Sequence, residues 1–160
     1  MDPGVTKKLR SCPNCGHAPL REETITDRFT YQVDGEEPID VEVRDVPIEV
    51  CPNCHERYFG PAAVRVQQAA VSRALGLLTP AEIQAIRERF GPTQADFARL
   101  TGIGEATISR WERGRMLPNP AMDRYLRLLD GNPNNVLLLK TLVAGPSAAL
   151  AGKIPGMAIP

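Results

Sequence analysis

The sequence has no long apolar run, few aromatic residues and no net charge. No stretch approaches the roughly 20 consecutive apolar residues that a membrane-spanning helix needs, and the early charges at Lys7 and Lys8 are not followed by the apolar core of a signal peptide. Aromatic residues make up 5% of the 160 residues, and prolines number 15. We therefore expect a cytoplasmic protein, neither secreted nor membrane-bound, with aliphatic cores and short elements rather than one large enzyme-like core.

The charges that cancel overall are distributed unevenly along the chain. Residues 1–60 carry seven Lys and Arg against twelve Asp and Glu, whereas residues 61–160 carry twelve against seven. An acidic front and a basic back are typical of two modules with different partners, and a basic module is a candidate for binding nucleic acid. The alternative is that solvated surfaces carry this bias by chance.

Cysteine is absent after residue 54, and the four cysteines form two matching pairs, Cys12-Pro13-Asn14-Cys15-Gly16 and Cys51-Pro52-Asn53-Cys54-His55. Two thiolates separated by two residues can bind one ion through a tight turn, and two such pairs complete a tetrahedral shell around Zn²⁺. We predict that one structural zinc ion is held by Cys12, Cys15, Cys51 and Cys54. Without zinc this module should not fold, because metal binding supplies most of the folding free energy of such small units.

Three other uses of the cysteines are less favoured. Structural disulfides fit poorly with a reducing cytosol, and a thioredoxin-like redox pair needs one such motif rather than two symmetric ones. A catalytic zinc ion usually leaves one position to water. His17 and His55 lie next to the pairs and could replace a cysteine, although exposed loop positions are the simpler interpretation.

Between the cysteine pairs, alternating apolar residues predict a β-hairpin or a three-stranded sheet. They are Ile25, Phe29, Tyr31 and Val33, then Ile39, Val41 and Val43, then Val46, Ile48 and Val50. Asp34-Gly35 marks a turn, and the change of phase between Val43 and Val46, near Pro47, indicates a bulge or a break into a further edge strand. Residues 1–60 are thus predicted to form a small zinc-bound β-module.

Residues 61–78 are predicted to link the two modules. Gly60-Pro61 opens a helix over residues 62–75, in which Val64, Val71 and Leu75 are spaced for one face and Gly76 marks the stop. This apolar stripe is thin, so we expect a partly exposed bridge that allows the two modules to rotate independently.

Helix-start and helix-stop residues predict five short helices between residues 79 and 144. Thr79 and Glu82 form a capping box around Pro80, and Asn-Pro pairs at 119–120 and 132–133 start the last two helices. Glycines at 91, 102, 114 and 131 end the first four. The whole chain is therefore predicted as an α+β, two-domain protein, with an all-α, five-helix domain at 79–144 and a flexible tail at 145–160.

Residues 94–113 have the anatomy of a helix-turn-helix, with Ala98 at the helix crossing, Gly102 at the turn and Ile108 as the anchor of the second helix. The outward face of the second helix would enter the major groove of DNA. We expect the DNA-binding residues to be Thr93, Gln94, Glu105, Ala106, Thr107, Ser109, Arg110, Arg113 and Arg115.

Arg110 is the best base reader of this set, because its guanidinium matches the two acceptors of guanine. Thr107 and Ser109 are expected to contact phosphate or sugar, Glu105 to accept from a cytosine amino group or to favour the helix dipole, and the remaining polar residues to hold the DNA backbone. The alternatives are a solvated helix face or a protein-interaction domain. Six Arg against three acidic residues between 99 and 127 favour DNA.

The last predicted helix, 132–143, has more apolar residues than one small face requires: Val136, Leu137, Leu138, Leu139, Leu142 and Val143. A homodimer formed through the C-terminal domain would use them and would place two recognition helices about 34 Å apart on a palindrome. Ordinary core packing is the alternative.

Two segments carry a family resemblance. Gln94-Ala95-Asp96-Phe97-Ala98 and Thr107-Ile108-Ser109-Arg110-Trp111-Glu112-Arg113-Gly114 resemble the lambda-repressor-like, xenobiotic-response-element class of helix-turn-helix. Combined with two Cys-Pro-x-Cys pairs about 35 residues apart, residues 10–143 resemble the MqsA family of antitoxins with the YgiT-type zinc finger. Ala106 stands where the family pattern has a longer, base-reading side chain, and the 16-residue tail lies outside the pattern.

The resemblance implies the antitoxin of a type II toxin–antitoxin system and not an enzyme. The zinc module would neutralise a toxin, commonly an mRNA-cleaving ribonuclease, and the helical domain would dimerise and repress its own operon. It also implies zinc ligation by the four cysteines, and Ser109 and Arg110 match the recognition-helix positions of the family. The alternatives are a stand-alone zinc-stabilised repressor of phage or host genes and a zinc- or thiol-dependent catalyst.

Overall fold

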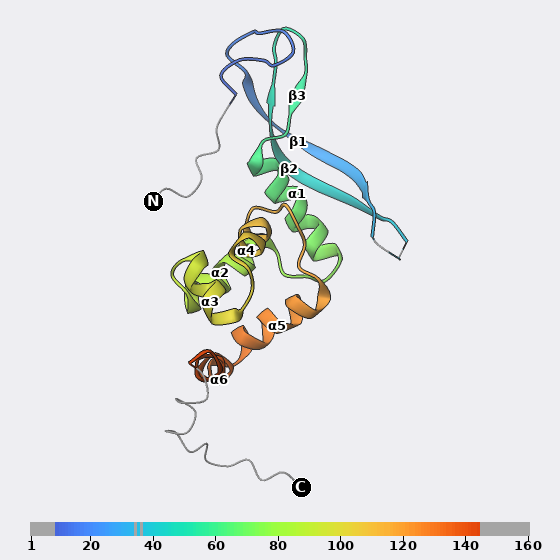
Figure 1. Cartoon of the computed structure of the whole chain (residues 1–160). Coiled ribbons are helices and arrows are strands. Elements are labelled where there is room, and N and C mark those ends of the chain that lie inside the picture. The colour runs from blue at the N-terminus through green and yellow to red at the C-terminus, as the bar shows by residue number, and fades with distance from the viewer. Residues whose placement is uncertain (1–8, 34, 36, 145–160) are drawn as a thin grey trace.

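The computed structural model describes residues 9–33, 35 and 37–144. Within these residues a three-stranded antiparallel sheet precedes six helices (Figure 1). The predicted α+β fold class is confirmed. The six helices are the predicted linking helix, α1 (Pro61–Ala74), and the five helices predicted after it. The predicted tail at 145–160 and Asp34 of the predicted turn lie outside the described residues. None of the helices in the described part has the length and apolar content needed to cross a membrane.

The sheet has the order β1-β2-β3 and contains β1 (Arg21–Tyr31), β2 (Ile39–Val50) and β3 (Arg57–Tyr58). Ile25 pairs with Val46 and Asp27 with Val43, so two residues of β2 lie opposite one residue of β1. This is a β-bulge, and β2 continues through it. The structure therefore selects the bulge over the break that the sequence also allowed.

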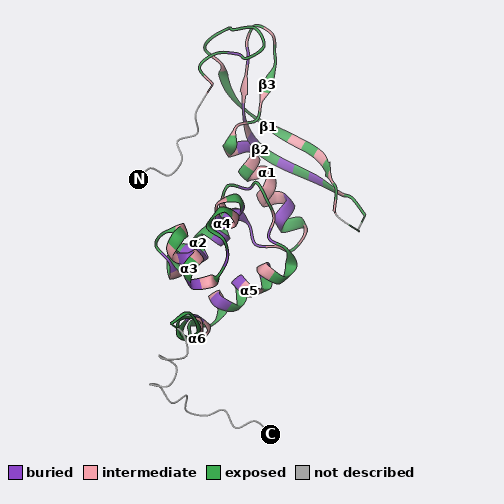
Figure 2. Ribbon diagram, in the orientation of Figure 1, coloured by how far each residue is buried: buried purple, intermediate pink, exposed green. Residues whose placement is uncertain are grey.

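The bulge keeps the apolar residues of β2 on one face of the sheet. Side chains alternate between faces along a strand, so one inserted residue restores the buried phase after Val43. Val41, Val43, Val46 and Ile48 are all buried as a result, and α1 (Pro61–Ala74) covers them with Ala63 and Val71 (Figures 1 and 2).

The helical region contains α2 (Pro80–Phe90), α3 (Gln94–Thr101), α4 (Glu105–Glu112), α5 (Pro120–Gly131) and α6 (Pro133–Val143). The capping box predicted at Thr79 and Glu82 is present at the start of α2. Asn119 and Asn132 cap α5 and α6 with their side chains, each ahead of a proline in the first turn. The local start signals therefore place these helices within one or two residues of their predicted starts.

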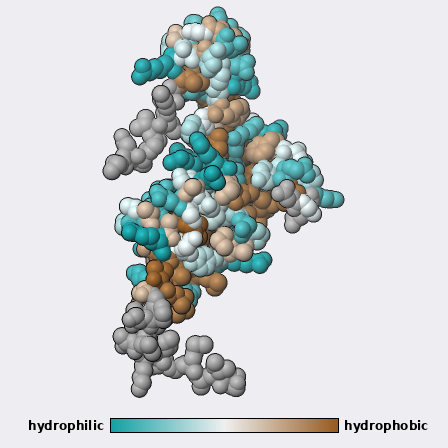
Figure 3. All heavy atoms as spheres, viewed as in Figure 1, coloured by the Kyte–Doolittle hydropathy of each residue, from teal (hydrophilic) through white to brown (hydrophobic). Residues whose placement is uncertain are grey.

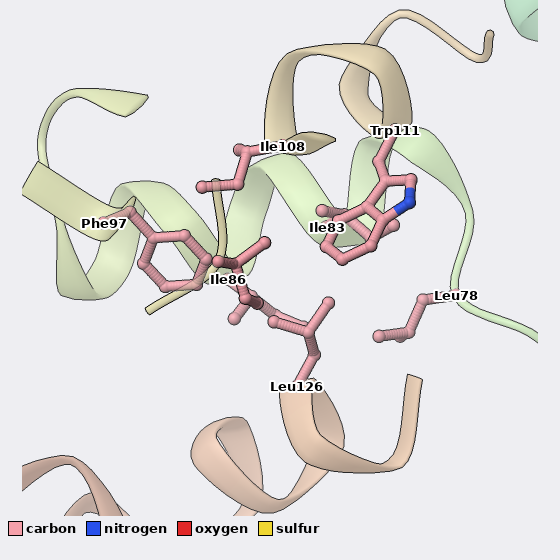
Figure 4. Close-up of a cluster of buried hydrophobic side chains, with 8 residues drawn as sticks. Leu78, Ile83, Ile86, Phe97, Ile108, Trp111 and Leu126 are labelled. Atoms are coloured by element: carbon pink, nitrogen blue, oxygen red, sulfur yellow. The ribbon is translucent and has the colours of Figure 1, made fainter. Parts of the chain in front are cut away.

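One apolar cluster holds the helical region together. Phe97 of α3, Ile108 of α4 and Leu126 of α5 are fully buried, and Ile83 and Trp111 pack against them (Figure 4). These side chains converge from α2, α3, α4 and α5, so the cluster fixes the orientation of α4 relative to the rest of the region.

Candidate functional site

The two cysteine pairs lie in two backbone turns of the same type. In the first turn the amide of Cys12 donates to the carbonyl of His17, and the amide of Gly16 donates to the carbonyl of Cys12. The second turn repeats both hydrogen bonds, five and four residues after Cys51. The residue four places on takes left-handed backbone in both turns, with φ of 73° at Gly16 and 59° at His55. The matched sequences thus fold into matched turns that aim their sulfurs at one point.

The four sulfur atoms form a compact cluster. All four Sγ atoms lie within 4.8 Å of one another, and the Cys12–Cys54 and Cys15–Cys51 Sγ distances are both 3.5 Å. Tetrahedral coordination with Zn–S bonds of about 2.3 Å requires sulfurs about 3.8 Å apart. The cluster therefore has the donor set and nearly the spacing of a four-thiolate metal site.

Two side chains outside the cluster donate hydrogen bonds to its sulfurs. The Tyr58 hydroxyl lies 3.1 Å from Cys12 Sγ, and Asn53 Nδ2 lies 3.5 Å from Cys15 Sγ. The hydrogen bond to Cys12, followed by burial, raises the pKa of Tyr58 to about 12, so the phenol keeps its proton and donates it. Such outer contacts orient metal ligands, and both residues were missed because their partners are distant in sequence.

The pKa values of two of the cluster thiols, Cys12 and Cys54, are shifted in opposite directions. Burial raises the pKa of Cys12, but hydrogen bonds from Tyr58 and from the amides of Cys15 and Asn14 outweigh it and lower the pKa to about 6. At Cys54, the amide of Glu56 lowers the pKa, but burial and the three other sulfurs raise it to about 11. Like charges repel at this distance, and a bound cation removes that penalty.

The structure also bears on the other uses considered for the cysteines. All four, which lie within the described residues, are free thiols, so the disulfide alternative is wrong. His17 and His55 are exposed and are not members of the cluster. The cluster in the described part of the chain therefore consists of four cysteines, which together could hold a metal ion.

The helix-turn-helix forms as its sequence predicts. Gly102 ends α3 with φ of 74°, a left-handed conformation that glycine adopts without steric cost. Ile108 and Trp111 of α4 face the apolar cluster, and Glu105, Ala106 and Arg110 are exposed on the opposite side. Thr107 and Ser109 are half-buried at the edges of that face.

Ion pairs separate the arginines of the helical region into two groups. The first group is neutralised by acidic neighbours: Arg87 with Glu112, Arg89 with Asp130, Arg99 with Asp96, and Arg127 with Asp123. Arg110, Arg113, Arg115 and Arg124 are exposed and form no ion pair with the described part of the chain. The three arginines predicted to contact DNA are therefore among those that acidic neighbours leave unpaired.

Two predicted contacts to the DNA backbone have internal partners. The Thr93 side chain accepts from the amide of Asp96 and caps α3. The Gln94 amide donates to Glu112 at 2.7 Å, and Arg87 donates to the other oxygen of the same carboxylate. Glu112, which the sequence did not single out, thus ties α2, α3 and α4 together. Its neighbours Arg87 and Gln94 come from other helices, so no local pattern reveals this role.

The apolar residues of α6 are mostly on the surface. Only Val136 is buried and Leu139 half-buried, whereas Leu137 and Leu142 are 62% and 69% exposed. Leu128 of α5 is also exposed, and Figure 3 shows brown, hydrophobic spheres gathered over α6. Packing within the described chain therefore accounts for a minority of these side chains.

Comparisons with known proteins agree with this combination of modules. A family model described as the antitoxin component of the bacterial toxin-antitoxin system, MqsA, matches residues 10–140. Antitoxin HigA-2 of Vibrio cholerae serotype O1 (strain ATCC 39315 / El Tor Inaba N16961) is 36% identical over 59 residues, 37% of this chain and 57% of that protein. The uncharacterized HTH-type transcriptional regulator YiaG of Escherichia coli (strain K12) is 36% identical over 52 residues, 32% of this chain and 54% of that protein.

The chain spans about half the length of the curated relatives it matches. The family match, by contrast, takes in both cysteine pairs and the helix-turn-helix. The resemblance drawn from the sequence is confirmed, and so is the prediction that the chain is not an enzyme, since antitoxins and regulators of this type are not catalysts. The chain belongs to the MqsA family of antitoxins.

Proposed function

We propose that this chain is the antitoxin of a type II toxin–antitoxin system and also represses its own operon. The N-terminal module, held by one structural Zn²⁺ on Cys12, Cys15, Cys51 and Cys54, neutralises a toxin that is an mRNA-cleaving ribonuclease. The helical region binds a palindromic operator as a homodimer in the cytoplasm. The observation that carries the proposal is the family match over both modules.

The DNA-binding part of the proposal is supported by the exposed face of α4. Arg110 is placed to read a guanine in the major groove, because its guanidinium is exposed and unpaired within the described residues. Arg113 and Arg115 follow at the end of the helix and hold the phosphates. Thr93, Gln94, Glu105, Ala106, Thr107 and Ser109 complete the proposed DNA surface.

The toxin-binding part is supported by the shape and charge of the sheet. β1 is the outer strand, and no strand in the described part of the chain pairs with its far edge. An open edge offers backbone donors and acceptors to a strand of another protein. Glu22, Glu23 and Asp40 are exposed along the hairpin, and a ribonuclease that binds RNA carries positive charge, so the two surfaces are complementary.

The dimer is supported by the exposed leucines of α6. A single helix with several leucines and one charge, Lys140, on its surface is typical of an interface rather than a solvated face. A two-fold axis through this helix would present two copies of α4 to a palindrome.

Co-expression with the product of the small adjacent open reading frame tests the proposal. We expect the tagged chain to co-purify with that product and to relieve the growth arrest that the product causes alone. Cys12→Ser should lose the toxin and keep the operator, whereas Arg110→Ala should keep the toxin and bind the operator about ten- to a hundredfold more weakly. Arg124→Ala, an exposed arginine of α5, is the control and should change neither.

The second candidate is a stand-alone zinc-stabilised repressor, which the similarity to the regulator YiaG favours. It predicts binding to a palindrome that Arg110→Ala weakens, with no partner protein and no arrest to relieve. That combination of results would replace the antitoxin proposal.

A further inference from the structure

The helix α1 is fastened to both modules, although its sequence suggested a loose linker. On the sheet side, Ala63 and Val71 are buried in the core of the sheet, and Gln67 Nε2 donates to Asp27 Oδ2 of β1 at 2.6 Å. These contacts make α1 part of the N-terminal module.

The loop that follows the recognition helix packs directly on α1. Gly114, with φ of 68°, ends α4 by donating its amide to the carbonyl of Trp111. A Cβ atom on Gly114 would lie 3.1 Å from Gln68 Cβ and 3.2 Å from Arg65 Cα, so a side chain there would require α1 or the loop to move by a few tenths of an ångström. Three residues on, Leu117 packs into the apolar cluster of the sheet and α1. A half-buried residue of the helical region therefore packs against the core of the N-terminal module.

The far end of α1 is held independently by α5. Asp123, a buried carboxylate of α5, accepts from the amide of Leu78 at 2.7 Å. Arg127, paired with Asp123, donates to the carbonyl of Gly76 at 3.1 Å. Backbone groups of the connection between α1 and α2 thus form hydrogen bonds with side chains of α5.

We propose that Gly114 and Leu117 lock the N-terminal module and the helical region into one rigid body, so that α1 sets the orientation of the recognition helix. Domains joined by small polar contacts move relative to each other by default, but here one apolar core is shared across the boundary. The consequence, which rests on the proposed function for the identity of the two ligands, is that a toxin on the sheet has a fixed position relative to DNA on α4.

Amide ¹⁵N relaxation of the full-length, zinc-loaded protein tests the lock without toxin or DNA. We expect the amides of β1 and β2 and those of α2 to α5 to report one common rotational correlation time. In Leu117→Ser the two sets should separate, with shorter times in the N-terminal module. Met116→Ser is the matched control, because Met116 lies next to Leu117 in the same loop, is 36% exposed and belongs to no apolar cluster.

A pair of glycine variants repeats the test without removing an apolar side chain. Gly114→Ala adds both backbone strain and the collision with α1. Gly76→Ala adds the strain alone, since Gly76 has the same φ of 68° and no atom within 4 Å of its Cβ position. We expect Gly114→Ala to separate the correlation times and Gly76→Ala to leave them equal.

Operator titration gives the functional readout. Leu117→Ser and Gly114→Ala should bind the operator roughly fivefold more weakly than their controls, because Arg113 and Arg115 flank the loop that is released. Separate correlation times in the wild type, or a common time in both Leu117→Ser and Gly114→Ala, would overturn the lock. Absence of operator binding by the wild type would instead overturn the proposed function and leave the relaxation result standing.

Discussion

The cysteine turns and the helical region are held together by different means. Within residues 9–20 and 51–60 only Cys12 and Cys51 are buried, whereas the helical region buries a cluster of eight apolar side chains drawn from four helices and their connections. Burial of apolar surface is the main source of folding free energy, and the cysteine turns have almost none. The metal therefore has to take the place of an apolar core in the cysteine turns. The helical region has its own core and does not need the metal to fold.

Removal of zinc should have the largest effect, and the loss of structure should be confined to the cysteine turns. Metal binding contributes about 10 kcal/mol or more to small zinc modules. Chelation or Cys51→Ser should therefore collapse the amide chemical shifts of residues 9–20 and 51–60 to unfolded values, while α2 to α5 keep theirs. His55→Gly, at an exposed position, should retain one zinc ion per chain. Loss of the helical signals on chelation would contradict the comparison.

Truncation of a core side chain of the helical region should have the opposite effect: it should destabilise the helices and leave the cysteine turns intact. Phe97→Ala should lower the free energy of unfolding of the helical region by about 3–5 kcal/mol, because Phe97 is fully buried among α2, α3, α4 and α5. Urea unfolding followed by circular dichroism measures this change, and zinc content should be unaffected. Phe59→Ala, at a 43% exposed phenylalanine after the second cysteine turn, should change stability by less than about 0.5 kcal/mol.

The helical region also depends on one buried ion pair. Glu112→Gln should cost about 3 kcal/mol, since the buried guanidinium of Arg87 then keeps only its ion pair with the exposed carboxylate of Glu88. Glu105→Gln, on the exposed face of the same helix, should cost about 0.5 kcal/mol through the helix dipole. Equal losses from the two variants, measured by the same urea titration, would show that Glu112 does not tie the helices together.

The smallest effect is expected at the capping box of α2, where Thr79→Ala should cost about 1 kcal/mol. Hydrogen bonds from the amide and hydroxyl of Thr79 lower the pKa of Glu82. Its charged form therefore stabilises the fold above its ordinary pKa, and this contribution is lost as pH falls toward the lowered value. The stability gap between wild type and Glu82→Gln should close over that acidic range, and a gap independent of pH would contradict this assignment.

Local patterns in the sequence were sufficient for much of the fold and for part of the site. The alternation of β2 predicted a bulge or a break between Val43 and Val46, start and stop residues predicted the helices α2 to α6, and the spacing of the cysteines predicted the four-sulfur cluster. Each of these features is encoded by residues close together in the chain. The exposed position of Arg110 also followed from the periodicity of α4.

What the sequence left out depends on contacts between distant residues. Glu112 receives hydrogen bonds from Arg87 and Gln94, and Leu117 enters the core of a sheet that ended more than 50 residues earlier. Neither position has a neighbour in sequence that signals its role. The expectation of independently rotating modules was likewise drawn from the stripe on α1 alone, without the loop that packs against it, and the proposed lock is the alternative to it.

The burial of Trp111 makes the recognition helix visible to fluorescence. Trp111 is the sole tryptophan of the chain and is 3% exposed. Its indole N–H has no hydrogen-bond acceptor within the described residues. A dry indole emits at short wavelength, and its emission shifts to the red when water reaches it. Emission from this one side chain therefore reports whether α4, the helix proposed to face DNA, is packed on its core, with no label added to the chain.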